Sequence, residues 1–309
     1  MSVIRTEGLS KVYSPGIGKA KVPALSGLEL RVEEREIFGF LGPNGAGKTT
    51  TMKILMGLIF PTSGEAWIFD RPIGDVEAKR QLGFLPEHPY FYDQLTGAEI
   101  LDYFGRLFGI DAPTRARRAK ELLERVGLGA AASQALRGYS KGMLQRIGIA
   151  QALINDPQLI VLDEPMSGLD PIGRKDVRDL ILSLRAEKRT VFFSTHILSD
   201  VEVVCDRVAI LSKGKVAAMS ALDDLLQLAG NEMEVILVGA DPALRAKLSA
   251  LPGARSSDSG DRLVVRVAQN DVSAVISLAG EAAARVLSVA PARRSLEEIF
   301  MQTAGRGAL

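Results

Sequence analysis

The sequence predicts an α/β fold built on parallel strands, followed by a small C-terminal α+β domain. A glycine-rich loop at residues 42–49 stands between an apolar, strand-like run and a helix-like run. A second apolar run, Leu159–Leu162, ends in two carboxylates, as a buried parallel strand does when its carboxyl end opens onto a site. After about Gly230, short strand-like and helix-like segments alternate, which indicates a separate unit.

The glycine-rich loop fits the phosphate-binding pattern G-x-x-x-x-G-K-[ST] without a mismatch. Residues 36–41 before it are strand-like and residues 50–56 after it are helix-like, which is the context that such a loop requires. Its glycines let backbone N–H groups point at the β- and γ-phosphates of a nucleotide. Lys48 adds a positive charge, and the hydroxyl of Thr49 is suited to Mg²⁺. The loop consists of Gly42, Pro43, Asn44, Gly45, Ala46, Gly47, Lys48 and Thr49.

The pattern turns helical from about residue 86 to about residue 157. Thr96 and Glu99 form a capping box in front of apolar residues at helical spacing. Thr114 is expected to cap a second helix. Ser140 is expected to cap a third, over residues 141–154.

The two carboxylates after Leu159–Leu162 are Asp163 and Glu164. Asp163 is placed to hold the Mg²⁺ shell, and Glu164 to accept a proton from an attacking water or to orient it. Taken alone, the segment fits equally well a strand followed by an Asp-Glu turn with no chemical role.

The rest of the chain continues this alternation. Asp170 and Pro171 are a good N-cap and first residue for a helix that extends to Ala186. Lys213-Gly214 reads as the turn of a hairpin. After Gly230 we expect strands at residues 232–238, 262–267 and 286–289, helices at 242–251 and 271–279, and a tail helix capped by Ser295.

Composition excludes several classes of protein. The net charge is +1, with 38 basic and 37 acidic residues, so no nucleic acid partner is expected. We expect the basic cluster Arg115, Arg117, Arg118 and Lys120 to be a solvated helix face. The single cysteine, Cys205, allows no intrachain disulfide, which suits the cytosol. No window approaches ~18–20 uncharged apolar residues, so any membrane pore must lie on another polypeptide.

Four further segments extend the pattern, in a fixed order with the loop and the carboxylates. They are Gly83-Phe84-Leu85-Pro86-Glu87, Tyr139-Ser140-Lys141-Gly142-Met143-Leu144-Gln145-Arg146, Ser167-Gly168-Leu169-Asp170 and Ser194-Thr195-His196. The set resembles the ATPase subunit of ABC transporters, from about Ile4 to about Leu228. The resemblance implies a P-loop NTPase core of the ABC ATPase type, with a helical lobe that carries the signature sequence. It also implies ATP hydrolysis with Mg²⁺.

The resemblance implies a role for each matching residue. Glu164 is similar to the catalytic base, and His196 to the switch histidine that contacts the γ-phosphate. Asp163 is similar to the metal-shell aspartate. Tyr13 is similar to the aromatic residue that stacks on adenine. On this reading nucleotide binding involves the phosphate loop, Thr50 directly after it, and Ser140 and Gly142 in the signature, and Lys48 of the loop is also a catalytic residue.

In this family two ATPase domains close head to tail, as a homodimer or as paired subunits. Each ATP then lies between one phosphate loop and the signature of the other subunit, and residues 167–170 communicate across the dimer. The sequence also gives a physical reason for this head-to-tail arrangement, because a helix that begins after Ser140 offers a second anion site at its N-terminus. An ordinary capped helix in a helical lobe is the other interpretation.

Two departures from the family pattern affect the site. Glu87 stands where the family has a glutamine that ligates Mg²⁺; it could still supply an oxygen to the metal, but it adds negative charge. The signature carries Tyr139, Lys141 and Met143 where its commonest form has Leu, Gly and Gln, and the role of Lys141 is open. Lys141 either favours the phosphates of the other subunit or points at solvent.

We therefore expect an ATPase domain at residues 1–228, with the helical lobe at about 86–157, and an accessory domain at 229–309. A C-terminal appendix that ends in Ser-Leu-Glu-Glu-Ile-Phe resembles the exporter subgroup of ABC ATPases. This implies a transmembrane permease as partner and a place at the cytoplasmic face of the cell membrane. The alternative is a soluble ABC-type ATPase acting on ribosomes or DNA. The single phosphate loop, and the absence of sustained heptads before the signature, weigh against it.

Overall fold

The computed structural model describes residues 2–14, 16, 20–227, 232–292, 296–297 and 299–300 of the 309-residue chain. The chain divides after Leu222 into two compact units, and Phe300 groups with the first. Each unit is treated by itself below. Ser295, the expected cap of the tail helix, lies outside the described residues.

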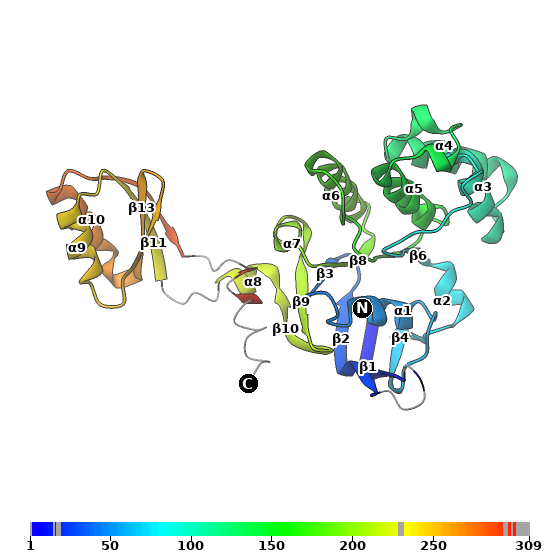
Figure 1. Ribbon diagram of the computed structural model, residues 1–309, viewed down its shortest axis with the longest axis horizontal. Helices are drawn as coiled ribbons and strands as arrows, with labels where there is room; N and C mark the ends of the chain where they lie inside the picture. The colour runs from blue at the N-terminus through cyan, green and yellow to red at the C-terminus, as the bar shows by residue number, and fades with distance from the viewer. Residues whose placement is uncertain are drawn as a thin grey trace. The chain divides into compact units, whose positions relative to one another are not determined.

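A six-stranded sheet forms the centre of the first unit, in the order β10-β9-β3-β8-β7-β6 (Figure 1). The first five strands along the chain run parallel, and only β10 is antiparallel. Because parallel strands end at the same edge, the loops that follow β3, β7 and β8 meet there. The strands are β3 (Ile37–Leu41), β6 (Leu82–Leu85), β7 (Leu159–Leu162), β8 (Thr190–Thr195), β9 (Arg207–Ser212) and β10 (Lys215–Ala221).

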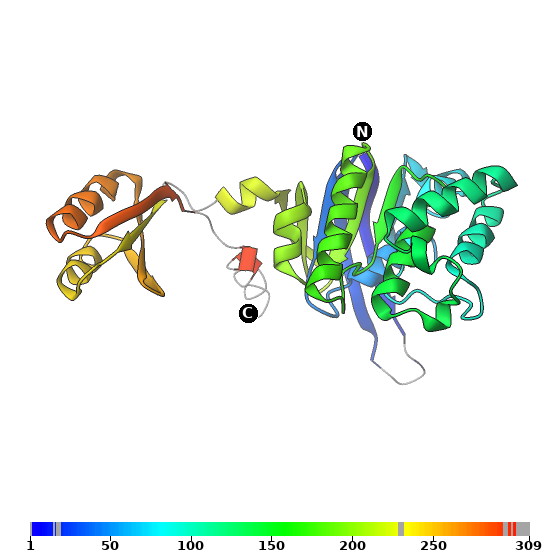
Figure 2. The ribbon, with the colours of Figure 1, turned by 90° about the horizontal axis from the view of Figure 1, so that it is seen from above.

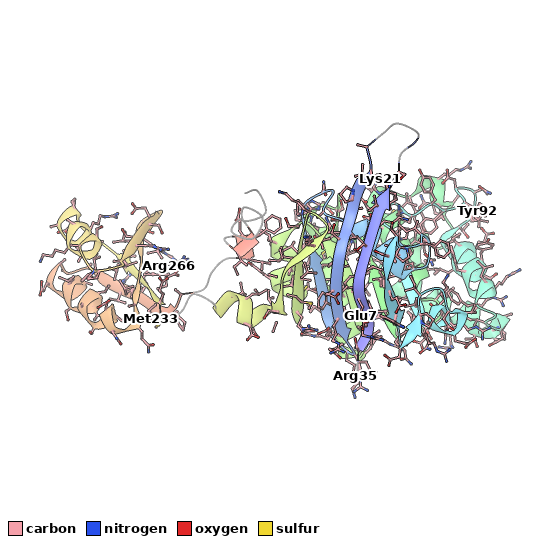
Figure 3. All side chains as sticks on the ribbon, turned by 90° about the horizontal axis from the view of Figure 1, so that it is seen from below. Glu7, Lys21, Arg35, Tyr92, Met233 and Arg266 are labelled. Atoms are coloured by element: carbon pink, nitrogen blue, oxygen red, sulfur yellow. The ribbon has the colours of Figure 1, made fainter. Side chains whose placement is uncertain are left out.

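An antiparallel sheet forms a second layer, in the order β2-β1-β4-β5. Figure 3 shows its two long strands side by side, with Lys21 near one end and Arg35 near the other. Helix α1 (Lys48–Leu55) packs between the two sheets. Leu9, Leu28, Phe40, Met52 and Phe192 belong to one buried core that joins these layers. The strands are β1 (Ser2–Tyr13), β2 (Val22–Glu33), β4 (Ser63–Ile68) and β5 (Arg71–Pro72), and the short helix α2 (Val76–Arg80) follows them.

Helices α3 (Gly97–Leu107), α4 (Ala112–Arg125) and α5 (Lys141–Leu153) gather into the expected helical lobe (Figures 1 and 2). The capping box at Thr96 is confirmed, with both reciprocal bonds to Glu99 present. The expected cap at Thr114 is wrong. Asp111 caps α4 by accepting from the Thr114 N–H at 3.0 Å, because Pro113 fits the first turn and places Thr114 inside the helix.

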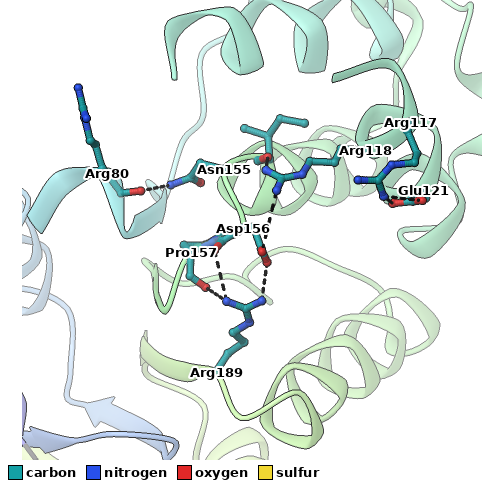
Figure 4. Close-up of polar contacts among 9 residues, drawn as sticks. Arg80, Arg117, Arg118, Glu121, Asn155, Asp156, Pro157 and Arg189 are labelled. Atoms are coloured by element: carbon teal, nitrogen blue, oxygen red, sulfur yellow. Dashed lines mark hydrogen bonds and ion pairs between the residues drawn. The ribbon is translucent and has the colours of Figure 1, made fainter. Parts of the chain in front are cut away.

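The return of the chain from the lobe to the core is held by two arginines around Asp156 (Figure 4). Arg189, directly before β8, pairs with the Asp156 carboxylate and donates to the Pro157 carbonyl at 3.0 Å. Arg118 of α4 donates to the Ile154 carbonyl at 3.0 Å. The expected solvated basic face is therefore only partly correct, because Arg118 turns toward the end of α5 and Arg115, whose side chain is 14% exposed, pairs with Asp102 of α3.

Two more helices cover the first unit. The helix α6 (Pro171–Ala186) begins at the predicted N-cap, Asp170, whose carboxylate accepts from the Gly173 N–H at 3.0 Å. The helix α7 (Leu198–Val204) follows β8. The hairpin between β9 and β10 turns at Lys213 and Gly214, both with positive φ, as predicted.

The second unit has a four-stranded antiparallel sheet in the order β12-β13-β11-β14, with two helices packed on one face (Figure 1). Each half of the unit has the order strand, helix, strand. Strand β12 was not predicted, because its Ser-Ser-Asp-Ser sequence carries no apolar alternation. The elements are α8 (Leu222–Gln227), β11 (Glu232–Val238), α9 (Pro242–Ser249), β12 (Arg255–Ser259), β13 (Arg262–Ala268), α10 (Val272–Glu281) and β14 (Arg285–Pro291).

Among the described residues, no helix combines the length and the apolar character needed to cross a membrane.

Candidate active site

The phosphate loop connects β3 to α1 at the carboxyl edge of the six-stranded sheet. Gly47 has φ +111°, and a Cβ there would lie 2.6 Å from the Ala24 carbonyl oxygen. A Cβ on Gly42 would lie 2.7 Å from the Leu211 carbonyl oxygen. Both positions therefore require glycine. No side chain caps the N-terminus of α1, which leaves its N–H groups available to an anion.

Lys48 reaches from this loop to the end of β7. Its Nζ donates to the Gly42 carbonyl at 2.8 Å and lies 3.2 Å from Oε1 of Glu164. The side chain is only 6% exposed. The pair joins residues that are more than a hundred positions apart in sequence, so its charge-assisted contact is a product of the fold.

Asp163 is buried at the end of β7, with 2% of its surface exposed. Ser194 of β8 donates to its Oδ1 at 2.6 Å, and the Glu164 N–H donates to Ser194 Oγ at 2.9 Å. Burial raises the pKa of Asp163, hydrogen bonds from Ser194 and Thr49 oppose this, and the charges of Glu87 and Glu164 raise it further. Ser194 thus fixes both carboxylate residues through one hydroxyl.

Glu164 has φ +51°, a left-handed conformation that is unfavourable for this residue type and concentrates at functional sites. Its Oε2 lies 2.9 Å from Nδ1 of His196, which donates to it when Nδ1 carries the proton. Lys48 holds the other carboxylate oxygen. The carboxylate that the sequence proposes as base is therefore oriented from two sides.

The donor set at this edge suits Mg²⁺. Asp163 offers carboxylate oxygens and Thr49 a hydroxyl within hydrogen-bonding reach of them, and Mg²⁺ prefers such hard oxygen ligands together with phosphates and waters. Glu87 is exposed, and its negative charge contributes to raising the pKa of Asp163. In the part of the chain that the structure describes, no group of three or more Asp, Glu, His or Cys side chains is placed to hold a metal ion. Mg²⁺ at this edge would therefore also need ligands from the phosphates and from water.

Tyr13 lies at the end of β1, beside the first turn of α1. Its hydroxyl is 3.5 Å from Oγ1 of Thr50, and Nζ of Lys11 lies 5.3 Å from the centre of its ring. The ring is 39% exposed. It therefore presents a partly exposed aromatic surface next to the phosphate loop.

Ser140 caps α5, accepting from the Met143 N–H at 3.3 Å, as predicted. Gly142 faces Leu169, since an added Cβ would lie 3.6 Å from Leu169 Cδ2. The side chain of Lys141 lies across Gly168, where a Cβ would collide with it. The lysine rests on residues 167–170 of its own chain, an arrangement that neither interpretation from the sequence included.

Two residues of this region had no predicted role. Ser194 is the last but one residue of β8, and a hydroxyl directly after the buried apolar run at residues 191–193 was the available signal. Asp200 is buried in the first turn of α7. No motif marks it, because its position depends on how α6 and α7 pack.

The fold and the site together define a nucleoside triphosphatase of the phosphate-loop class. The chain belongs to the family of ABC transporter ATP-binding proteins, so the predicted resemblance and fold are confirmed. The family model described as "ABC transporter" matches residues 25–167. An uncharacterized ABC transporter ATP-binding protein of Synechocystis sp. is 45% identical over 307 residues, or 97% of this chain and 84% of the relative.

Two further relatives bear on activity. A fluoroquinolones export ATP-binding protein of Mycobacterium tuberculosis is 40% identical over 226 residues, 72% of each chain. The structure of the ATP-binding cassette MJ0796, a dimer in a post-hydrolysis state bound to ADP and Pi, superposes with a TM-score of 0.65 at 27% identity. The match covers 71% of this chain and 98% of that one. This chain, as a member of the family, is an ATPase.

Proposed function

We propose that this chain is the ATP-hydrolysing subunit of an ABC exporter and drives a substrate through a separate transmembrane permease. The convergence of Lys48, Glu164 and His196 at the carboxyl edge of the sheet carries the catalytic part of the proposal. The similarity to a fluoroquinolones export protein favours export as the direction of transport. None of the relatives described above points to the alternative, an ATPase acting on ribosomes or DNA.

The chemistry follows from the contacts of the Glu164 side chain. Phosphates bound by the loop compete with Glu164 for the charge of Lys48, and transfer of the lysine to them frees one carboxylate oxygen for the attacking water. Glu164 then accepts the proton of that water, while His196 keeps the carboxylate aligned. Asp163 and Thr49 would hold Mg²⁺, which would supply positive charge to the phosphates. Tyr13 stacks on the adenine base.

Two copies of the chain complete the site. The N-terminus of α5, with Ser140 and Gly142, provides an anion site that the phosphate loop of the same chain does not use. A head-to-tail pair places this helix end on the ATP of the other copy. The dimeric form of the relative bound to ADP and Pi supports such a pairing.

The permease is proposed to dock in an apolar groove of the first unit. The groove has a volume of about 420 Å³ and lies where the core meets the helical lobe. Tyr90, within the segment at residues 87–94 that links them, is 95% exposed. A short amphipathic helix on the cytoplasmic side of a permease fits this lining. The apolar lining includes Met56, Leu58, Phe84, Tyr90, Phe91, Phe104 and Phe108.

Membrane association of the tagged chain in its native cells tests this proposal. Tyr90→Asp and Phe108→Asp place charge in the groove and should shift the chain from washed membranes to the supernatant. ATPase activity of the purified variants should stay within about twofold of wild type, because neither side chain touches the site. Val203→Asp is the matched control, since Val203 is 58% exposed on α7, away from the groove.

Groove variants that remain on the membrane as wild type does would contradict docking in the groove. Wild-type chain that never associates with membranes would contradict the permease altogether. Neither outcome alters the ATPase assignment, because the purified chain is assayed separately.

A further inference from the structure

Asp200 is a buried carboxylate that the catalytic mechanism above does not use. It lies in the first turn of α7, four residues after His196, with 1% of its surface exposed. Its Oδ1 is 3.7 Å from a terminal nitrogen of Arg178 on α6. Its Oδ2 has no hydrogen-bond partner among the described residues. A buried carboxylate oxygen without a partner is costly, so this arrangement requires an explanation.

Arg178, which pairs with Asp200, lies on α6, the helix that begins directly after residues 167–170. Arg174 lies one turn before Arg178 on α6, and its Nε donates to the Leu169 carbonyl at 3.2 Å. Asp170, the last residue of that loop, is the N-cap of α6. Residues 167–170 and the start of α6 are therefore expected to move together. Asp200 contacts α6 one turn further along, at Arg178.

Asp200 also lies within the electrostatic field of the catalytic residues. Burial raises the pKa of Asp200, and the positive charges of Arg174 and Arg178 oppose this, as does His196. The charge of Glu164 raises it further. Asp200 is thus influenced both by the charges of the proposed catalytic pair and by those of the two arginines of α6.

We propose that Asp200 is a positioning residue, which holds α7 against α6 so that His196 stays aligned with Glu164 when residues 167–170 move. This role accounts for the loose geometry of the ion pair between Asp200 and Arg178. A separation of 3.7 Å and an open oxygen let the carboxylate tighten on one arginine or the other as α6 shifts, which a fully bonded structural pair does not allow. The proposal rests on the proposed roles of His196 and Glu164.

A double-mutant cycle on ATP hydrolysis tests the proposal. Asp200→Asn keeps the volume of the side chain and removes its charge, and Arg178→Met removes the partner. Each single variant should lower kcat by about tenfold while the Kd for ATP stays within about twofold of wild type. The double variant should be no slower than the slower single variant, because both changes remove the same contact. Asp200→Glu should recover a measurable part of kcat.

Matched controls lie on the same two helices. Glu202→Gln removes an exposed carboxylate from α7, and Lys175→Met removes an exposed cation from α6. Both should keep wild-type kcat. Thermal unfolding of every variant accompanies the kinetics, so that a loss of folded protein is not counted as a loss of rate.

Wild-type kcat in Asp200→Asn, or effects that multiply in the double variant, overturn the proposal. If Asp200→Asn does not fold, Arg178→Met decides alone, and an unchanged kcat in that variant also overturns it. Glu164→Gln and His196→Ala are assayed in parallel. Normal hydrolysis by those two refutes the catalytic assignments themselves, whereas their failure together with a normal Asp200→Asn refutes only the positioning role.

Discussion

Oε1 of Glu164 lies 3.2 Å from Nζ of Lys48, and both side chains are almost completely buried. The contact joins the proposed base, at the end of β7, to the cation of the phosphate loop. Each group is the oppositely charged neighbour of the other in this buried site, beside the Gly42 carbonyl for the lysine and His196 for the glutamate. Any ligand that draws the lysine away must therefore act on the base as well, and the predictions below follow from this coupling.

Glu164→Gln should trap ATP. The amide keeps the size of the side chain but cannot accept the proton of the attacking water, so hydrolysis should fall by about 10²–10⁴-fold while binding persists. Release of phosphate and retention of labelled ATP on the purified chain measure the two effects. Glu121→Gln, an exposed change on α4, serves as the control. Near-normal turnover in Glu164→Gln would remove the residue from the mechanism.

Lys48→Ala should damage ATP binding, hydrolysis and stability together. The lysine is placed to touch phosphates in both ground and transition states, so Kd should rise and kcat should fall. Glu164 would be left buried with only His196 beside its carboxylate, which should lower the free energy of unfolding by on the order of 1–3 kcal/mol. Lys53→Ala, on the exposed side of the same helix, is the control for titration calorimetry and thermal unfolding. Unchanged ATP affinity and unchanged turnover in Lys48→Ala would contradict the assignment.

Much of the core of this site could be predicted from the sequence because it is local. The phosphate loop requires glycine at positions that the motif itself names, and Asp163 and Glu164 follow a run apolar enough to identify a buried strand. The helix caps at Thr96, Ser140 and Asp170 also depend on neighbouring residues alone.

What the sequence could not predict depends on segments that meet only in the fold. The pairing of Lys48 with Glu164 and the path of Lys141 over Gly168 require the packing of elements distant in the chain. The cap of α4 is a different case, because Pro113 two residues after Asp111 is a local signal for Asp111 as the N-cap, and the sequence analysis missed it. Strand β12 forms because its neighbour β13 offers a partner, since its own residues lack β-propensity.

Glu87→Gln should extend ATPase activity to lower pH. Burial is the main reason that the pKa of Asp163 is raised, and the charge of Glu87 adds to it. Asp163 must be ionised to hold Mg²⁺, so activity is present above its pKa and is lost as the pH falls through it. Removing the neighbouring charge lowers that pKa. The acid limb of the pH–rate profile at saturating Mg²⁺ should move to lower pH, and an unmoved or upward-shifted limb would contradict this role of Glu87.

Tyr13→Ala should weaken ATP binding by about 1–3 kcal/mol, if stacking on adenine has the strength measured for nucleic acid bases. Tyr13→Trp should be tolerated, because the larger ring still offers a face beside Thr50. Binding of ATP compared with inorganic triphosphate separates the adenine contribution from that of the phosphates. Equal ATP affinities in wild type and Tyr13→Ala would show that the ring packs only on its own chain.

A mixed dimer tests whether the two ATP sites are shared between subunits. Ser140→Arg places a bulky cation at the N-terminus of α5, and Lys48→Ala disables a phosphate loop. In a head-to-tail pair of one subunit of each kind, both defects fall in the same composite site, and the other site stays intact. In either homodimer both sites carry a defect.

Mixtures of the two variants should therefore hydrolyse ATP faster than either variant alone, provided that one intact site turns over. The gain should depend on the mixing ratio and be largest near equal amounts, where mixed dimers are most abundant. Two tagged forms purified in sequence isolate the mixed dimer and exclude a contribution from residual homodimers. If Ser140→Arg homodimers hydrolyse ATP as wild type does, or if the wild-type rate per chain stays constant on dilution to monomers, the shared site is wrong. Each chain would then complete its own hydrolysis, and the N-terminus of α5 would be no more than a capped helix end.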